Sequence, residues 1–582
     1  MRGRALKEWA VVILIPVLLV GISLYAQKLT MVEWDKVVKY QSPYLYSLPP
    51  GKTSPPLSSQ VVVVVVDGLR VDMSRQLSSY NKLRQLGAGF TATTGQPSLS
   101  DPGAAVIASG TYHEIHGVTT NWYEGLLKVD SIVAAAKRAG LRTGVAGGKG
   151  YQQLHGSNID VGKFFDWYDA DPQRYDSDVE KASKELAAAD PKVNFFFVHY
   201  SATDNEAHAH GGVSPEYTKA AQDIDKHILN FLTSIDLTKT TVILTADHGH
   251  IDTGGHGGWE SVVTQVPLVM AGPGIRPGRY GTVGQGDIAP TVAALLGAPI
   301  PAHATGRVLD EALNGSDEVM ASILAKEAEQ KQAFYSMYLK TVGGAESLKA
   351  AADDNVKAAK AALTAKNWKS AIAGSQAARS SLTLAAGKAR LDKLQGERKG
   401  RALSTILMVL VPGLLLWLAA RKRNFGAALA AAATYFVVYN LMFFGLHHYL
   451  LSLSSFNEEG LIKAYFNQRM IEAAVSALVA AVVYGVLAGR RGATGLQLAS
   501  GGAVVSGLVW YGLFLQVLLM VYAYGLKFDW MLPDLELGFK FYLDMLQMVA
   551  TGLAAVAVPL VAVGAGAIGR ATTARSGRTL TR

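Results

Sequence analysis

The stretch VVVVVVDGLRVD, residues 61–72, decides the fold of this 582-residue chain. Its six consecutive valines form an apolar, β-branched run that is typical of a strand buried on both faces of a sheet. Two later runs have the same character, VNFFFVHY at residues 193–200 and TVILTAD at residues 241–247. Helical patterns separate the three runs, so we expect an α/β domain with a mostly parallel central sheet flanked by helices.

Acidic and imidazole side chains gather where these runs end. One carboxylate ends the first run, a D-x-x-x-H pattern follows the second, a D-H pair ends the third, and a glycine-flanked histidine comes shortly afterwards. Any one of them alone would more readily cap a helix or satisfy a local hydrogen bond. Open α/β sheets bind ligands at the carboxyl ends of their strands, and Zn²⁺ accepts both imidazole nitrogen and carboxylate oxygen, so the joint pattern predicts metal binding. The six residues are Asp67, Asp204, His208, Asp247, His248 and His256.

The distribution of apolar residues identifies an integral membrane protein. Apolar residues make up 49% of the chain and charged residues 17%. Several uncharged runs reach the length of roughly 18 residues or more that a membrane-spanning helix needs. The run at residues 9–25 follows three basic residues, and we interpret it as an uncleaved signal anchor. Five further candidate spans cover residues 403–420, 426–446, 471–489, 501–524 and 545–568.

Basic residues beside these spans indicate the orientation. With six crossings, the positive-inside rule places both termini and the basic clusters 421–423 and 490–491 in the cytoplasm. The segment from about residue 27 to residue 401 is then extracytoplasmic. It would face the periplasm or the outside of the plasma membrane, or the lumen of the endoplasmic reticulum if the source is eukaryotic.

These patterns predict five segments along the chain. They are a signal-anchor helix at 1–27, a catalytic domain at 28–315, a helical linker at 316–400, an all-α bundle of five transmembrane helices at 401–570 and a basic cytoplasmic tail at 571–582. The linker is rich in Ala, Lys, Glu and Gln at helical spacing, and no catalytic group stands out in it.

The net charge of +9 does not indicate nucleic-acid binding. Many Lys and Arg residues flank the apolar runs or lie in the helical stretch 326–399, and no basic motif interleaved with aromatic residues occurs. The chain has no cysteine, which excludes disulfides, thiolate metal ligands and a cysteine nucleophile.

The order of the motifs resembles the alkaline phosphatase superfamily. DGLRVD, PSLSDPG, DNEAHAHG, DHGHIDTGGHGG and GDIAPTVAALLGAPIP follow one another between residues 67 and 301. Within the superfamily these motifs are similar to the type I phosphodiesterase and nucleotide pyrophosphatase group. The closest resemblance is to the GPI ethanolamine phosphate transferases, particularly the enzyme that acts on the first mannose. The short, Ala- and Gly-rich, cysteine-free chain suggests a prokaryotic relative whose acceptor is not GPI.

The resemblance implies two bound divalent metal ions, with zinc as the expected metal and manganese or another divalent ion as an alternative. Its ligand sets are Asp204, His208 and His256 for one ion, and Asp67, Asp247 and His248 for the other, beside the nucleophile. Two such ions, about 4 Å apart, clamp the attacking and the leaving oxygen of a displacement at phosphorus. Further histidines are expected as supporting or surface groups, namely His113, His116, His210 and His250.

The nucleophile is expected in the loop TTGQPSLSDPGAA, residues 93–105, which offers Thr94, Ser98 and Ser100. The family places Thr or Ser directly after a proline, with a second proline four residues on, and this pattern selects Ser98. Ser100 is the rival, because Ser100-Asp101-Pro102 faintly resembles the S-x-P signature of sulfatases. A sulfatase is disfavoured, since Gly-Ala follows where the signature continues with Ser-Arg.

The predicted activity is phosphoethanolamine transfer. The resemblance implies phosphatidylethanolamine as donor and a covalent intermediate on serine, and the five additional spans favour a lipid or glycolipid acceptor over a soluble one. The alternative is a membrane-bound phosphodiesterase or nucleotide pyrophosphatase, in which water is the acceptor. A catalytically silent lipid-handling protein would lack a ligand, and all six ligands occur. Nothing in the sequence indicates an oligomeric state.

Overall fold

The computed structural model describes residues 2–166, 171–456 and 459–579. The chain forms two compact units. The catalytic unit holds residues 38–395 and 529–535, and the membrane unit holds the N-terminal helix together with residues 396–528 and the C-terminal helices.

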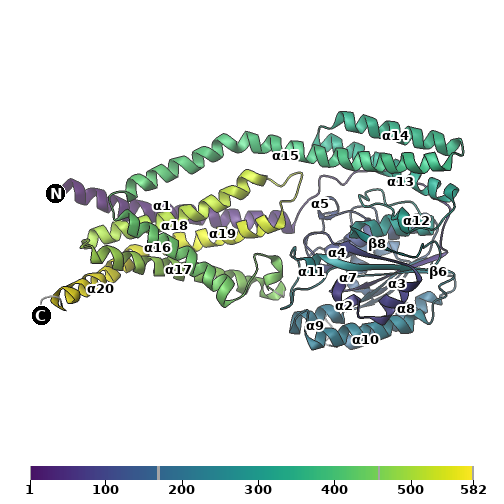
Figure 1. The fold of residues 1–582 in the computed structure, drawn as a ribbon, viewed down its shortest axis with the longest axis horizontal. Coiled ribbons are helices and arrows are strands. Elements are labelled where there is room, and N and C mark those ends of the chain that lie inside the picture. The colour runs from purple at the N-terminus through teal and green to yellow at the C-terminus, as the bar shows by residue number, and fades with distance from the viewer. Residues whose placement is uncertain (1, 167–170, 457–458, 580–582) are drawn as a thin grey trace. The chain divides into compact units, whose positions relative to one another are not determined.

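An eight-stranded sheet forms the centre of the catalytic unit (Figure 1). The strand order is β4-β3-β5-β1-β6-β7-β2-β8, and only β7 runs antiparallel to its two neighbours. The predicted α/β class with a mostly parallel sheet is therefore confirmed. The strands are β1 Gln60–Val66, β2 Ala88–Thr93, β3 Thr143–Gly148, β4 Val161–Phe165, β5 Phe195–Tyr200, β6 Thr240–Thr245, β7 Gln265–Ala271 and β8 Gly278–Gly284.

The valine run forms the middle of this sheet. β1 lies between β5 and β6, and all six valines are inaccessible to solvent, which explains why the strand carries no polar alternation. Val65 is paired with His199 on one side and with Thr245 on the other, so the three strands end in register. The residues that follow them therefore meet at one edge of the sheet.

Helices cover the sheet and supply part of the site. Helix α8 packs on β3 and β5, α12 packs on β1, and α10 begins at a Ser214 cap followed by Pro215. The helices of this region are α2 Val71–Ser74, α3 Ser78–Leu86, α4 Ser100–Ser109, α5 His113–His116, α6 Ile132–Arg138, α7 Lys149–His155, α8 Pro172–Ala187, α9 Ala202–His210, α10 Pro215–Leu232, α11 Ser261–Thr264 and α12 Ile288–Leu296.

Three helices follow the sheet domain, α13 Asp317–Val342, α14 Glu346–Thr364 and α15 Trp368–Ala420. A buried ion-pair network ties them to it, because the Arg379 guanidinium of α15 contacts Glu327 of α13 at 3.1 Å and Asp310 at 3.0 Å. The Glu327 side chain is almost fully buried. Helix α15 then continues without a break from the region predicted as linker into the first predicted C-terminal span.

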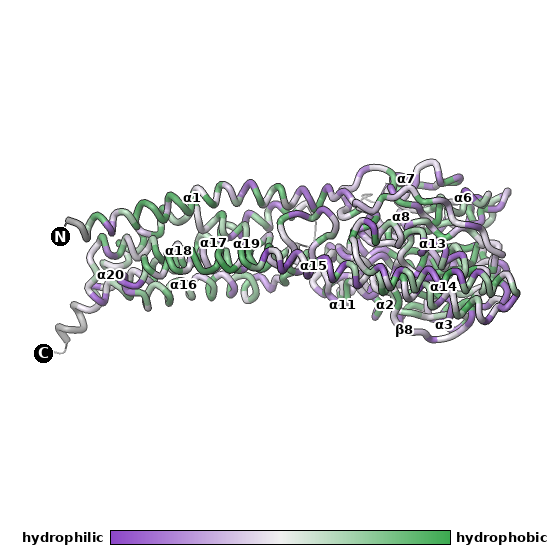
Figure 2. The backbone as a smooth tube through the Cα atoms, turned by 90° about the horizontal axis from the view of Figure 1, so that it is seen from above, coloured by the Kyte–Doolittle hydropathy of each residue, from purple (hydrophilic) through white to green (hydrophobic). Residues whose placement is uncertain are grey.

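The membrane unit consists of long apolar helices, on which Figure 2 shows hydrophobic residues concentrated. In the described parts of the chain, five helices are long and apolar enough to span a membrane. They are α1 Arg2–Val38, α15, α16 Phe425–Asn440 with its π-helical extension Leu441–Leu446, α17 Ile462–Arg490 and α18 Gly495–Tyr524. Ser23 of α1 donates a hydrogen bond to the Met548 carbonyl, so the first helix packs on one made near the end of the chain.

The last predicted span, residues 545–568, is not one straight helix. Helices α19 Leu535–Ala554 and α20 Val558–Thr579 meet at an angle of 66°, and they make a sixth crossing only if the pair counts as one span. Pro559 lies in the first turn of α20, where proline is tolerated, but it could not have continued α19 without losing a hydrogen bond. Hydropathy does not register such a break.

Candidate metal-binding active site

The edge where β5, β1 and β6 end collects the predicted ligands. Asp67 directly follows β1, and Asp247 and His248 follow β6. Asp204 and His208 lie four residues apart on α9, which starts after β5, so both point from the same face of that helix. His256 comes from the glycine-rich loop after β6.

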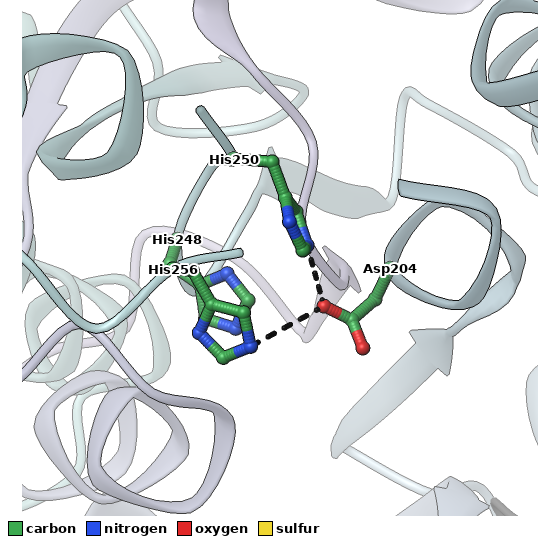
Figure 3. A group of neighbouring side chains, drawn as sticks. All are labelled: Asp204, His248, His250 and His256. Atoms are coloured by element: carbon green, nitrogen blue, oxygen red, sulfur yellow. Dashed lines mark hydrogen bonds and ion pairs between the residues drawn. The ribbon is translucent and has the colours of Figure 1, made fainter. Parts of the chain in front are cut away.

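Two groups of ligand atoms form there. Asp67, Asp247 and His248 offer atoms that all lie within 4.8 Å of one another, and so do Asp204, His248, His250 and His256. Figure 3 shows the second group, in which His250 and His256 both face the Asp204 carboxylate. His208 joins this group, because its Nε2 lies 3.2 Å from His256 Nε2. The structure thus brings all six predicted ligand residues together.

Hydrogen bonds to the ring nitrogens fix which histidines can bind a metal. His256 Nδ1 lies 2.9 Å from the Ser98 carbonyl, to which it donates, and its Nε2 lone pair then faces Asp204 and His208. His248 Nδ1 donates to the Gly249 carbonyl at 3.2 Å, which leaves its Nε2 free as well. Three carboxylates and the imidazole lone pairs of His248 and His256 converge here, a set of ligands that fits divalent metal ions such as zinc.

His250 is protonated on the other ring nitrogen, Nε2. Its Nδ1 accepts a hydrogen bond from the Gly255 backbone N–H, so Nε2 carries the proton and donates to Asp204 Oδ1 at 2.7 Å. A protonated nitrogen has no lone pair for a metal. His250 therefore holds the Asp204 carboxylate in place, in the way that outer hydrogen-bond partners orient metal ligands.

The electrostatics of the site favour a cation. Burial raises the pKa of Asp67 well above its usual value, and the neighbouring Asp247 and Asp204 carboxylates raise it further. At Asp204 burial acts in the same direction, but His208, His250 and His256 outweigh it and hold the pKa of that carboxyl well below its usual range. A divalent cation between Asp67 and Asp247 would relieve their mutual repulsion.

The two candidate serines lie in different surroundings. Ser98 Oγ lies 3.0 Å from the Gly95 carbonyl, 3.1 Å from the Gly258 carbonyl and 3.1 Å from the Thr94 hydroxyl, away from the carboxylates. Ser100 Oγ lies 3.2 Å from His248 Nε2 and 3.5 Å from Asp67 Oδ1. This placement favours Ser100, the rival, over Ser98 as the nucleophile. Ser98 instead fixes the loop and, through its carbonyl, orients His256.

The position of Ser100 in α4 favours its deprotonation to an alkoxide. It is the first residue of this helix, whose N-terminal dipole favours negative charge on a nearby oxygen. The helix can approach the metal site because residue 103 is a glycine, at which a Cβ atom would lie 3.0 Å from the Asp247 Cβ. Asn121 accepts the Asp101 backbone N–H at 3.1 Å, which places its side-chain amide beside the same helix start.

Two supporting residues were not predicted from the sequence. Asn121 lies in a loop with no motif around it. His199 lies inside β5, with its Nε2 3.2 Å from Asp67 Oδ2 and its Nδ1 3.1 Å from the Tyr175 hydroxyl. Burial lowers the pKa of His199 to about 4, so it is neutral at physiological pH. An imidazole in an otherwise apolar buried strand was the signal that could have identified it.

Part of the chain is similar to known proteins. Residues 61–340 match the family model of type I phosphodiesterase / nucleotide pyrophosphatase. The chain is similar to human GPI ethanolamine phosphate transferase 1, with 24% identity over half of this chain and 37% of the relative. It is also similar to the catalytic subunit of human GPI ethanolamine phosphate transferase 2, with 26% identity over 45% of this chain and 28% of the relative. The chain thus matches 37% of the length of the first relative and 28% of the length of the second.

The chain is also similar to solved structures, at low sequence identity. Murine ectonucleotide pyrophosphatase / phosphodiesterase 5 is 13% identical, covers 41% of this chain and 96% of its own, and gives a TM-score of 0.36. Wild-type alkaline phosphatase PafA is 12% identical, covers 45% of this chain and 99% of its own, and gives a TM-score of 0.39. As its motifs predicted, residues 61–340 of this chain match the type I phosphodiesterase / nucleotide pyrophosphatase family.

Proposed function

We propose that this protein is a metal-dependent phosphoethanolamine transferase, which moves phosphoethanolamine from phosphatidylethanolamine to a hydroxyl of a lipid or glycolipid. The observation that carries the proposal is the Ser100 hydroxyl, which lies beside Asp67 and His248 at the edge of the sheet where the two ligand groups form. The similar human proteins are ethanolamine phosphate transferases, which supports phosphoethanolamine as the transferred group. The apolar helices of the membrane unit agree with lipid substrates.

In this proposal the chain holds two divalent metal ions, expected to be zinc. The ligand sets are Asp204, His208 and His256 for one, and Asp67, Asp247 and His248 for the other. When bound, such ions supply a positive charge that favours an alkoxide and stabilises the charge developing on the phosphoryl oxygens.

Ser100 performs the covalent chemistry. Its Oγ attacks phosphorus, the bond from phosphorus to the diacylglycerol oxygen breaks, and the leaving oxygen ends with the proton that the serine loses. In the second half the acceptor hydroxyl attacks the phosphorus of the phosphoethanolamine–Ser100 diester, the Ser100 Oγ–P bond breaks, and the acceptor's proton returns to Ser100. The α4 N-terminus and the Asn121 amide are placed to bind phosphoryl oxygens.

The second candidate is a phosphodiesterase in which water takes the place of the acceptor. It is favoured by the matched family model, whose name describes hydrolases. The same six ligands and the same serine would serve both reactions.

A label-retention experiment tests the proposal. The full chain in detergent is incubated with phosphatidylethanolamine labelled in the ethanolamine, with and without candidate glycolipids. Wild type and the matched variant Ser98→Ala should release diacylglycerol and retain label on the protein, whereas Ser100→Ala should lose at least 100-fold in rate and retain none. Loss of label with Ser98→Ala but not with Ser100→Ala would refute the assignment. Free phosphoethanolamine as the only product under all conditions would establish the hydrolase.

The catalytic unit is proposed to lie outside the cytoplasm, with both chain termini inside. This orientation is supported by the basic clusters that flank the apolar helices.

A further inference from the structure

A cluster of buried polar side chains lies within the membrane unit, on helices that pack together. We call it the intramembrane polar cluster, and its members are Tyr439 of α16, Arg469 and Glu472 of α17, and Asp544 of α19. Arg469 is fully inaccessible to solvent, and the other three side chains are buried. Tyr439 stacks on Phe443, over which the Arg469 guanidinium lies, and also on Tyr435. The Tyr435 hydroxyl donates to Gln547, which in turn donates to Asp544, so α16 connects the α17 and α19 members of the cluster.

The charges in this cluster are only partly paired. Arg469 Nη2 donates to Glu472 Oε1 at 2.9 Å, and His447 Nε2 lies 2.8 Å from the same oxygen. Within the described residues, no hydrogen-bond partner is found for Arg469 Nε and Nη1, Glu472 Oε2, Asp544 Oδ2 or the Tyr439 hydroxyl. Such groups cost free energy when buried, and ionisable residues inside a membrane usually have a functional reason.

The surroundings of Arg469 stabilise its charge without using its donors. Its guanidinium lies 4.7 Å from the ring centre of Tyr449, 5.3 Å from that of Tyr465 and 5.7 Å from that of Phe443. These cation–π contacts are favourable, but the ring faces do not accept ordinary hydrogen bonds from the guanidinium N–H groups. Phe443 lies in the π-helical segment Leu441–Leu446, a rare geometry that is frequent at functional sites.

The buried donors and acceptors that lack a hydrogen-bond partner indicate which chemical groups a ligand should carry. Guanidinium N–H groups bind phosphate oxygens, and a carboxylate oxygen binds a protonated amine. Arg469 and Lys540, which pairs with Asp544, balance the two carboxylates, so a ligand with net charge would disturb the cluster. A zwitterion with one phosphate and one ammonium group would not.

We propose that the intramembrane polar cluster binds the headgroup of a zwitterionic phospholipid, with its phosphodiester at Arg469 and its primary ammonium at Glu472. A primary ammonium donates hydrogen bonds that a trimethylammonium lacks, so the cluster selects an ethanolamine over a choline headgroup. The site goes beyond the catalytic centre, since it would retain the donor lipid within the membrane unit. It rests on the proposed function only in that the expected donor has this headgroup.

Lipid retention by the full chain tests this site without any turnover. The Ser100→Ala protein is reconstituted with equal amounts of phosphatidylethanolamine, phosphatidylcholine and phosphatidylglycerol of identical acyl chains, and retained lipid is counted by native mass spectrometry. We expect retained phosphatidylethanolamine to exceed each of the others at least fivefold. Glu472→Gln should abolish the preference over phosphatidylcholine, and Arg469→Gln should reduce retention of all three about tenfold.

Glu8→Gln is the matched control, because Glu8 pairs with Arg423 elsewhere in the membrane unit. It should leave the lipid preference unchanged. If Arg469→Gln does not fold, the isosteric variants Glu472→Gln and Asp544→Asn test the site on their own. Each should lose the preference for phosphatidylethanolamine over phosphatidylcholine. Equal retention of the three lipids by the Ser100→Ala protein, or an unchanged preference in both isosteric variants, would overturn the site. Neither result would change the outcome of the label-retention experiment, which tests the transferase activity separately.

Discussion

His250 lies among the predicted metal ligands and has their residue type, but its hydrogen bonds set it apart from them. The Gly255 N–H occupies its Nδ1, so its Nε2 can only donate to Asp204. A glutamine places an amide N–H close to the position of that Nε2. His250→Gln should therefore keep the bond to Asp204, whereas His250→Ala should lose it.

We predict that His250→Ala weakens metal binding by roughly 10- to 100-fold, the usual effect of removing an outer partner, and that His250→Gln retains most of the affinity. Metal content after dialysis against graded chelator, measured by plasma mass spectrometry, checks this. Circular dichroism of each variant controls for folding. Equal losses in the two variants would mean that His250 itself ligates the metal.

The convergence of the six proposed ligand residues could be predicted from the sequence, because each follows a strand whose apolar composition is unmistakable. The roles of Ser98 and His199 could not be predicted. Ser98 and Ser100 are two residues apart in one loop, and only the local backbone decides which hydroxyl reaches His248. His199 lies in a strand whose apolar composition predicts only buried packing residues.

At the scale of elements, the Arg379–Glu327–Asp310 network joins α15 to α13 and to the sheet domain. Removing one member of a buried ion pair leaves the other charge without a partner, which costs about 3–5 kcal/mol. Arg379→Ala should therefore lower the free energy of unfolding of the catalytic unit by about that amount. Adding Glu327→Gln should recover part of the loss, since the stranded carboxylate is then neutral.

Lys388→Ala is the matched control for this prediction. Lys388 pairs with Asp392 on the exposed face of the same helix, where an ion pair contributes at most about 1 kcal/mol. Denaturant titration followed by circular dichroism measures all three variants. Equal effects of Arg379→Ala and Lys388→Ala would show that the buried network does not stabilise the unit.

The elements themselves were predictable to different degrees. The strands and the apolar helices follow from composition and periodicity. The continuity of α15 from the predicted linker into the predicted span, and the bend between α19 and α20, do not, because a hydropathy window measures apolar content and not helix direction. These two features depend on the backbone hydrogen bonds around Pro559 and along residues 395–405.

For the whole molecule, the proposed orientation can be measured directly because the chain has no cysteine. Lys369 and Lys422 are both exposed, the first before the apolar half of α15 and the second after it. A membrane-impermeant maleimide added to intact cells should modify the Lys369→Cys variant and leave Lys422→Cys unmodified until the cells are opened. The reverse pattern would place the catalytic unit in the cytoplasm.

The hydrogen bond from Ser23 to the Met548 carbonyl joins residues 525 positions apart in the sequence. Because a ribosome makes the chain from its N-terminus, α1 emerges before the catalytic unit and its partner α19 after it. The whole catalytic unit is synthesised in between. During translation, α1 must therefore remain in the bilayer without its packing partner α19. The sheet domain can fold before the helix bundle is complete.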